Sequence, residues 1–165
     1  MRLFLLAVLS ILSVARAAFA AGGGGDGMAA VVSGFYGVYQ TFHPSDGIPS
    51  AADRAKYAPF LSPTLETLLS EAEAAETRFA KANKDSPPLL EGDLFTSLFE
   101  GATSVAIGTC TGDSAKGRCS IKLEHDDKTA KPTTWNDTVL LVKTPAGWRV
   151  DDIAYGGSWA FGNKG

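Results

Sequence analysis

The hydrophobic pattern of this chain changes its period at two consecutive prolines, residues 87 and 88. Before them, apolar residues recur every three or four positions, as on one face of a helix. After them come short apolar or β-branched runs at 104–110, 118–124, 138–144 and 148–155, separated by Gly, Asp, Lys and Pro clusters that are typical of turns. Helices followed by an antiparallel sheet make an α+β order. We therefore predict one α+β domain over residues 28–155, with N-terminal helices packed on about four strands.

Three helices are predicted before the prolines. The first has Asp26 as its N-cap, and Gly34 and Gly37 predict a face where another backbone comes close. Its apolar residues are Met28, Val31, Val32, Phe35, Tyr39 and Phe42. A short second helix is predicted to start at Ser50. The third has Ser62 as its N-cap and Pro63 at its first position. We expect its apolar stripe to cover one face of the sheet; the stripe is Leu65, Leu68, Leu69, Ala72 and Phe79.

Residues 1–20 have the pattern of a secretory signal peptide. Arg2 supplies a positive n-region, residues 3–14 form an apolar run too short to cross a bilayer, and two A-x-A patterns place cleavage after residue 17 or 20. A membrane anchor is the alternative interpretation. Residues 21–27 are expected to be a flexible Gly-rich lead, and residues 156–165 a tail in which Trp159 and Phe161 either dock or stay loose. We expect a periplasmic or secreted protein with no membrane anchor after cleavage.

The charge of the chain argues against two classes of partner. Loss of residues 1–20 removes Arg2 and Arg16 and changes the formal net charge from −3 to −5. A mildly acidic chain without a basic cluster is poorly suited to nucleic acid or to an anionic membrane. We therefore expect neither as a partner.

The two cysteines predict a disulfide. An even cysteine count in an exported chain favours a bridge. If the stretch GDSAKG, residues 112–117, turns at its midpoint, Cys110 directly faces Cys119 across an antiparallel pair. The same register pairs Ala106 with Leu123 and Gly108 with Ile121. A redox or metal-binding thiol pair is the alternative, but the C-x-x-C spacing and a neighbouring His cluster are missing.

Few residues suggest chemistry. The side chains available as neutral-pH bases are His43 and His125, and the stretch EHDD, residues 124–127, could hold a cation, although such a run is more typical of a solvated turn. Asp93 precedes an apolar segment and suits either a capped turn or a site acid. No phosphate-loop, dinucleotide, zinc-protease or nucleophile-elbow motif occurs in the sequence. We expect no cofactor and no metal, and we name Asp93 and Asp152 as the weak catalytic candidates.

Asp151 and Asp152 are adjacent in the last predicted strand. Successive side chains of a regular strand point to opposite faces, so the two carboxylates cannot form one catalytic pair. In a regular strand Asp152 would face inward, with the parity of Trp148 and Val150, and Asp151 would face solvent. The apolar parity slips at this point, however, and a β-bulge at the aspartates would return Ile153 to the face of Trp148.

The helices, the stretch EGDLFTSLFEGATSVAIG (residues 91–108) and the closing GWRVDDIAY (147–155) resemble a bacterial family of exported domains. That family has the nuclear-transport-factor-two-like, or cystatin-like, α+β fold, and the resemblance covers residues 28–155. It implies a curved antiparallel sheet wrapped around helices, often leaving a cone-shaped pocket. Some such folds are isomerases or dehydratases with an Asp or His base, and others only bind ligands or partners. No family catalytic residue maps onto this sequence, and fold alone does not assign chemistry.

The leading functional hypothesis is an exported, non-catalytic module that binds a small ligand or a protein partner. One rival is a cofactor-free lyase or isomerase with a pocket carboxylate, Asp93 or Asp152, as its base. Another is a toxin-neutralising or envelope-structural protein. A deep apolar cavity with a buried carboxylate would favour the enzyme, and a filled core with an exposed apolar patch would favour binding.

Overall fold

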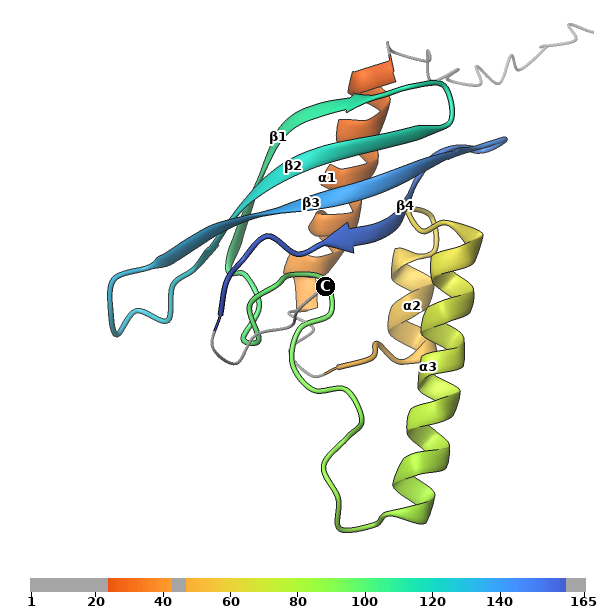
Figure 1. Ribbon diagram of the computed structural model, residues 1–165, viewed down its shortest axis with the longest axis vertical. Coiled ribbons are helices and arrows are strands. Elements are labelled where there is room, and N and C mark those ends of the chain that lie inside the picture. The colour runs from red at the N-terminus through yellow and green to blue at the C-terminus, as the bar shows by residue number, and fades with distance from the viewer. Residues whose placement is uncertain (1–23, 43–46, 160–165) are drawn as a thin grey trace, which may run out of the picture.

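The computed structural model describes residues 24–42 and 47–159 (Figure 1). Three helices precede a four-stranded antiparallel sheet, so the predicted α+β order is confirmed. The elements are α1 (Gly24–Phe42), α2 (Ala51–Tyr57), α3 (Pro63–Ala82), β1 (Ser104–Gly112), β2 (Lys116–His125), β3 (Thr133–Thr144) and β4 (Gly147–Ala154). The predicted signal peptide, the start of the Gly-rich lead, His43, the side chain of Phe42 and Phe161 lie outside the described residues.

Two of the three predicted helix starts are confirmed. The Ser50 hydroxyl accepts the N–H of Asp53 at 3.3 Å, and the Ser62 hydroxyl accepts the N–H of Leu65 at 3.0 Å, so each serine caps its helix. Pro63 occupies the first turn of α3, where its missing N–H costs nothing.

The predicted start of α1 is wrong. The helix begins at Gly24, so Asp26 lies inside its first turn and is not the N-cap. Tertiary packing explains the longer helix, because a Cβ placed on Gly27 would lie only 3.4 Å from the Trp148 indole. The last residues of the predicted flexible lead are therefore helical against the sheet.

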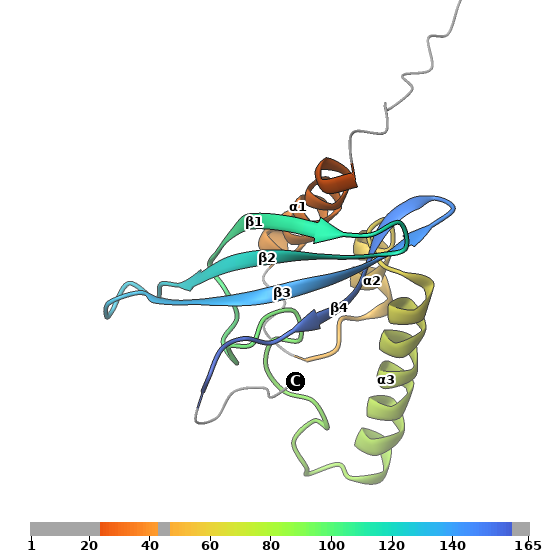
Figure 2. The same cartoon turned by 45° about the horizontal axis from the view of Figure 1, so that its top comes forward.

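The helix that covers the sheet is α1, not α3 as predicted. Helix α1 packs on β1, β2 and β4 and buries Met28, Val32, Phe35, Tyr36 and Tyr39. Helix α3 meets the sheet at β4 and otherwise projects beyond it (Figures 1 and 2). Its predicted stripe is accordingly exposed in part: Leu69 is buried, but Leu68 is 55% exposed.

The chain between α2 and α3 closes one edge of the sheet. The N–H of Val150 donates to the carbonyl of Phe60 at 2.8 Å, and the N–H of Ser62 donates to the carbonyl of Val150 at 2.7 Å. These two bonds form a parallel bridge beside β4. They satisfy backbone groups that an open edge would leave unpaired, and they set where α3 starts.

The β1–β2 hairpin contains the predicted disulfide and an unpredicted irregularity. Cys110 lies opposite Cys119 and is bonded to it. The two other predicted pairs are wrong, because Ala106 faces Lys122 and Ile107 faces Ile121. The register shifts between Ile107 and Cys110, so β1 contains one more residue there than the symmetric hairpin requires. A Cβ on Gly108, within this bulge, would come 2.5 Å from the Ser120 hydroxyl.

The predicted bulge in β4 is confirmed. Leu140 pairs with Asp152 and Leu141 pairs with Val150, so Asp151 is the extra residue. Trp148, Val150 and Ile153 are all buried, as the bulge required.

None of the helices within the described ranges combines the length and the apolar character needed to cross a bilayer.

Candidate ligand-binding groove

Asp93 is a buried carboxylate that orders the segment after α3. Its side chain is 1% exposed; one oxygen accepts the N–H groups of Phe95 at 2.6 Å and Thr96 at 3.0 Å, and the other accepts the hydroxyl of Tyr39. The Tyr39 oxygen in turn accepts the N–H of Ala102 at 2.8 Å. Burial raises the pKa of Asp93 to about 6, although the hydrogen bonds from Tyr39, Phe95 and Thr96 oppose this rise. The carboxylate thus ties residues 93–102 to α1.

Asp137 is a second buried carboxylate, and the sequence analysis missed it. One oxygen accepts the Ser97 hydroxyl at 2.8 Å and the N–H of Gly156 at 2.7 Å. The other accepts the N–H of Ser97 at 2.8 Å and the indole N–H of Trp135 at 3.1 Å. The sequence did contain a signal for the burial of Asp137, because this residue has the same strand parity as the apolar residues Trp135 and Val139 in β3.

The C-terminal tail docks on this network as far as it is described. The indole N–H of Trp159 donates to the Ser97 hydroxyl at 3.4 Å, and its ring stands edge-on to Trp135 with centroids 5.6 Å apart. Of the two possibilities left open for the tail, docking is the one observed at Trp159.

The space between α1, α2 and residues 93–102 is filled by aromatic rings. Phe35, Tyr57 and Phe95 are all buried, and each pair of ring centroids is 5.0 Å apart. The Tyr36 hydroxyl donates to the carbonyl of Phe95 at 2.8 Å and holds that segment in place. A filled core stands here in place of the cone-shaped pocket that the resemblance implied.

An open hollow of about 490 Å³ lies between α3 and the segment that follows it, and we call it the α3 groove. Its volume is in the range of small-ligand sites. Helix α3 supplies one wall and residues 88–99 supply the other. The lining residues are Ile48, Glu73, Glu76, Thr77, Pro88, Leu90, Glu91, Gly92 and Phe99.

Two glycines in the left-handed region shape the second wall. Gly47 has φ of 71° and Gly92 has φ of 77°, and the N–H of Gly47 donates to the carbonyl of Gly92 at 2.8 Å. A Cβ on Gly92 would lie 2.5 Å from the Phe99 ring, and one on Gly47 would lie 2.5 Å from the Leu90 carbonyl oxygen. Both positions require glycine, so the wall has one defined backbone path.

Exposed apolar side chains gather at this groove. Leu90 is 43% exposed and Phe99 is 40% exposed, and both line it. The neighbouring Leu89 is 49% exposed. Large apolar side chains exposed together at a hollow are a common sign of a binding surface.

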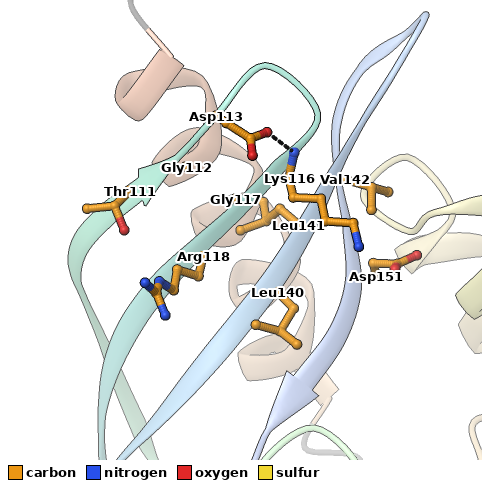
Figure 3. Close-up of a pocket in the computed structure, with 10 residues that line it drawn as sticks. All are labelled: Thr111, Gly112, Asp113, Lys116, Gly117, Arg118, Leu140, Leu141, Val142 and Asp151. Carbon is orange, nitrogen blue, oxygen red and sulfur yellow. Dashed lines mark hydrogen bonds between the residues drawn. The ribbon is translucent and has the colours of Figure 1, made fainter.

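A second hollow, of about 390 Å³, lies over the end of the sheet and mixes charges of both signs (Figure 3). The side chains of Lys116 and Arg118 extend in different directions from β2, and the end of the Lys116 side chain points toward Asp151. Asp113 accepts the N–H of Lys116 at 2.8 Å, which lowers the pKa of this carboxyl. With two acids and two bases, this hollow has no net preference for ligand charge. Its lining residues are Thr111, Gly112, Asp113, Lys116, Gly117, Arg118, Leu140, Leu141, Val142 and Asp151.

The bulge places the two adjacent aspartates differently from a regular strand. Asp152 is exposed, and the expectation that it faces inward is wrong. Asp151 is half-buried and accepts the Ser62 hydroxyl at 2.5 Å. Asp152 borders a smaller hollow of about 190 Å³, whose other lining residues are Leu65, Leu69, Leu94, Phe95, Ile153 and Tyr155. The structure therefore separates the two carboxylates, as the sequence predicted.

The EHDD stretch ends strand β2 at His125 and begins the loop that follows it. Asp126 accepts the N–H of Lys128 at 2.9 Å and is paired with its ammonium group, and Asp127 accepts the N–H of Thr129 at 2.9 Å. His125 donates from Nδ1 to the carbonyl of Gly101 at 2.9 Å. Within the described residues, no three His, Cys, Asp or Glu side chains converge as a metal site requires.

The fold and the site together define a class of protein: an α+β domain with a filled core and an open, acidic and apolar groove beside α3. No protein-family model matches the chain, and no curated protein matches it as a relative.

Proposed function

We propose that this chain is an exported, non-catalytic binding module that holds its ligand in the α3 groove. The observation that carries the proposal is the combination of a filled core with apolar side chains left exposed at one hollow. Folding normally buries Leu and Phe, and the exposure of Leu90 and Phe99, at 43% and 40% on the rim of one hollow, supports a surface that another molecule covers.

The placement of the buried carboxylates supports a binding role over a catalytic one. A general base must reach its substrate within hydrogen-bond distance. Asp93 is enclosed at 1% exposure, and its oxygens accept N–H groups of its own segment and the Tyr39 hydroxyl. Asp137 is bound in the same way by Ser97, Trp135 and Gly156. These bonds give both carboxylates a structural task.

As part of the same proposal, the protein is located outside the cytoplasm and has a nuclear-transport-factor-two-like or cystatin-like fold. The Cys110–Cys119 bridge is consistent with an oxidising, extracytoplasmic location such as the periplasm, and residues 1–20 carry the export pattern. The helices-then-meander order suits a nuclear-transport-factor-two-like or cystatin-like domain in which aromatic rings occupy the usual pocket.

Binding of a neutral apolar dye, Nile red, tests the groove without knowledge of the natural ligand. We expect dye fluorescence to rise with the wild-type protein and to fall several-fold with Leu90→Ser. The matched control is Leu68→Ser, which alters an exposed leucine of α3 that does not line the groove. Equal dye binding by both variants, or none by the wild type, would remove the groove from the proposal.

A further inference from the structure

The α3 groove is acidic as well as apolar. Among the described residues that line it, three of nine are glutamates, Glu73, Glu76 and Glu91, and none is Lys, Arg or His. Its apolar side chains come from residue 48 and from residues 88, 90 and 99. An occupant that matches this surface needs a cationic group beside an apolar body.

The charge of one glutamate is already compensated. Glu73 Oε2 lies 2.7 Å from the Nη1 of Arg54, a buried arginine that also lies 3.6 Å from Glu66. Arg54 donates as well to the carbonyl of Pro49 at 2.9 Å. Glu73 therefore belongs to the framework that joins α2 to α3.

The other two glutamates have no cationic partner among the described residues. Glu76 Oε2 accepts the N–H of Leu89 at 2.8 Å, and a backbone amide orients this carboxylate without neutralising it. In the part of the chain that the structure describes, neither Glu76 nor Glu91 has a Lys, Arg or His nitrogen within 4.0 Å. Within the described part of the chain, the groove thus presents two carboxylates without a cationic partner, one from α3 and one from the opposite wall.

We propose, on the basis of the binding function above, that the occupant of the α3 groove is a basic, apolar segment of another polypeptide. Its Lys or Arg side chains pair with Glu76 and Glu91, and its apolar side chains cover Leu90 and Phe99. The extent of the apolar surface favours a peptide over a small amine, because Leu89 continues it at 49% exposure beyond the residues that line the hollow.

Fluorescence anisotropy with three labelled octapeptides tests this proposal. Leucine alternates with lysine in the first, with glutamine in the second and with glutamate in the third. At low ionic strength we expect the wild-type protein to bind the lysine peptide most tightly and the glutamate peptide least. Added salt should weaken lysine-peptide binding and reduce the difference between the three.

Charge-removing variants locate the interaction. Glu91→Gln should weaken lysine-peptide binding about 2- to 5-fold, the range for one exposed ion pair, and Glu76→Gln/Glu91→Gln by about 5- to 20-fold. Glutamine at residue 76 keeps an acceptor for the Leu89 amide. The matched control is Glu71→Gln, an exposed glutamate of α3 that does not line the groove, and it should leave binding unchanged. Thermal unfolding of each variant reports whether it folds.

The two proposals fail in different ways. The proposal of a cationic occupant is wrong if Nile red binds through Leu90 but the three peptides bind equally. It is also wrong if Glu71→Gln weakens peptide binding as much as Glu91→Gln does. In both cases the proposal that the groove is a binding site is unaffected. If a small apolar amine binds with the same Glu76 and Glu91 dependence while no peptide does, the peptide is wrong. If neither dye nor peptide binds, the proposed function itself is wrong.

Discussion

The hydroxyl of Ser62, at the start of α3, donates a 2.5 Å hydrogen bond to the carboxylate of Asp151 in β4. The same oxygen accepts the N–H of Leu65 and so caps α3. One serine therefore joins the long helix to the sheet at the β-bulge. Because α3 forms one wall of the groove, this junction also sets where that wall stands.

Substitution of Ser62 by Ala should destabilise the protein by about 1–3 kcal/mol, since it removes a helix cap and leaves a half-buried carboxylate without its donor. Urea unfolding measures the change. The control is Asp152→Asn, which should stay within about 0.5 kcal/mol of the parent because Asp152 is exposed. A loss of stability for Asp152→Asn as large as that for Ser62→Ala would contradict the assignment of the two aspartates.

Asp93 should make the protein less stable as the pH rises from about 4 to 7. Its pKa is about 6 in the folded state, above the ordinary aspartate value of 3.8, so the folded chain keeps this proton to higher pH than the unfolded chain does. Protonation of Asp93 contributes fully to the free energy of unfolding below the pKa that this carboxyl has in the unfolded chain. The contribution is lost as the pH rises through about 6, the pKa in the folded chain. A shift of this size corresponds to at most roughly 3 kcal/mol.

The comparison of wild type with Asp93→Asn isolates this contribution. Asparagine keeps an oxygen for the N–H groups of Phe95 and Thr96 and does not titrate. The difference in unfolding free energy between the two proteins should change with pH between about 4 and 7. A constant difference over that range would show that the Asp93 pKa is not raised by folding.

Gly34 and Gly37 in α1 should respond in opposite ways to alanine. The predicted close approach of another backbone at these glycines is wrong, because the neighbour at Gly34 is a side chain: a Cβ there would overlap the Phe60 ring. Among the described residues, no heavy atom of another segment would lie within 4 Å of a Cβ on Gly37. We expect Gly37→Ala to stabilise the protein by about 0.5–1 kcal/mol through helix propensity. Gly34→Ala should be less stable than Gly37→Ala by about 2 kcal/mol. Equal melting temperatures for the two variants would contradict this packing.

Removal of the disulfide should cost about 2 kcal/mol, because the bridge between Cys110 and Cys119 closes a short loop. Thiol labelling of the unfolded, unreduced protein should detect no free thiol. The Cys110→Ser/Cys119→Ser variant should unfold at lower urea concentration and keep its far-ultraviolet circular dichroism. Two labelled thiols in protein isolated from the periplasm would show that the bridge does not form there.

Export predicts a defined N-terminus. Signal peptidase cleaves after small residues, so N-terminal sequencing of the exported protein should begin at Ala18 or Ala21. Recovery from the membrane fraction of a chain that begins at Met1 would favour the anchor instead.

Much of the local structure could be read from the sequence. The four strands, the helix start at Ser50, the cap at Ser62, the β4 bulge and the partnership of Cys110 with Cys119 were all predicted correctly. Each depends on residues close together in the chain: on the period of apolar side chains, on a capping hydroxyl or on the length of one turn.

The remaining features depended on tertiary structure. Helices α1 and α3 are both amphipathic, but α1 is much the more apolar of the two. Helix α3 starts at the β4 edge, next to the backbone bonds of Phe60 and Ser62 with Val150. The bulge at Gly108 moved the β1 register by one residue, which no count from the turn could reveal. The strand parity of Asp137 pointed inward, but its partners Ser97 and Gly156 come from distant segments and were visible only in the structure.

The α3 groove is one of the features that only the tertiary structure defines. Its walls come from residues 48, 73–77 and 88–99, and its shape depends on the approach of Gly47 to Gly92. Apart from the first turn of α1, the sequence by itself determined which segments become helices and strands, because the period of apolar residues and the capping residues are local. The tertiary structure alone decided which apolar side chains stay exposed, because burial depends on every segment that packs nearby.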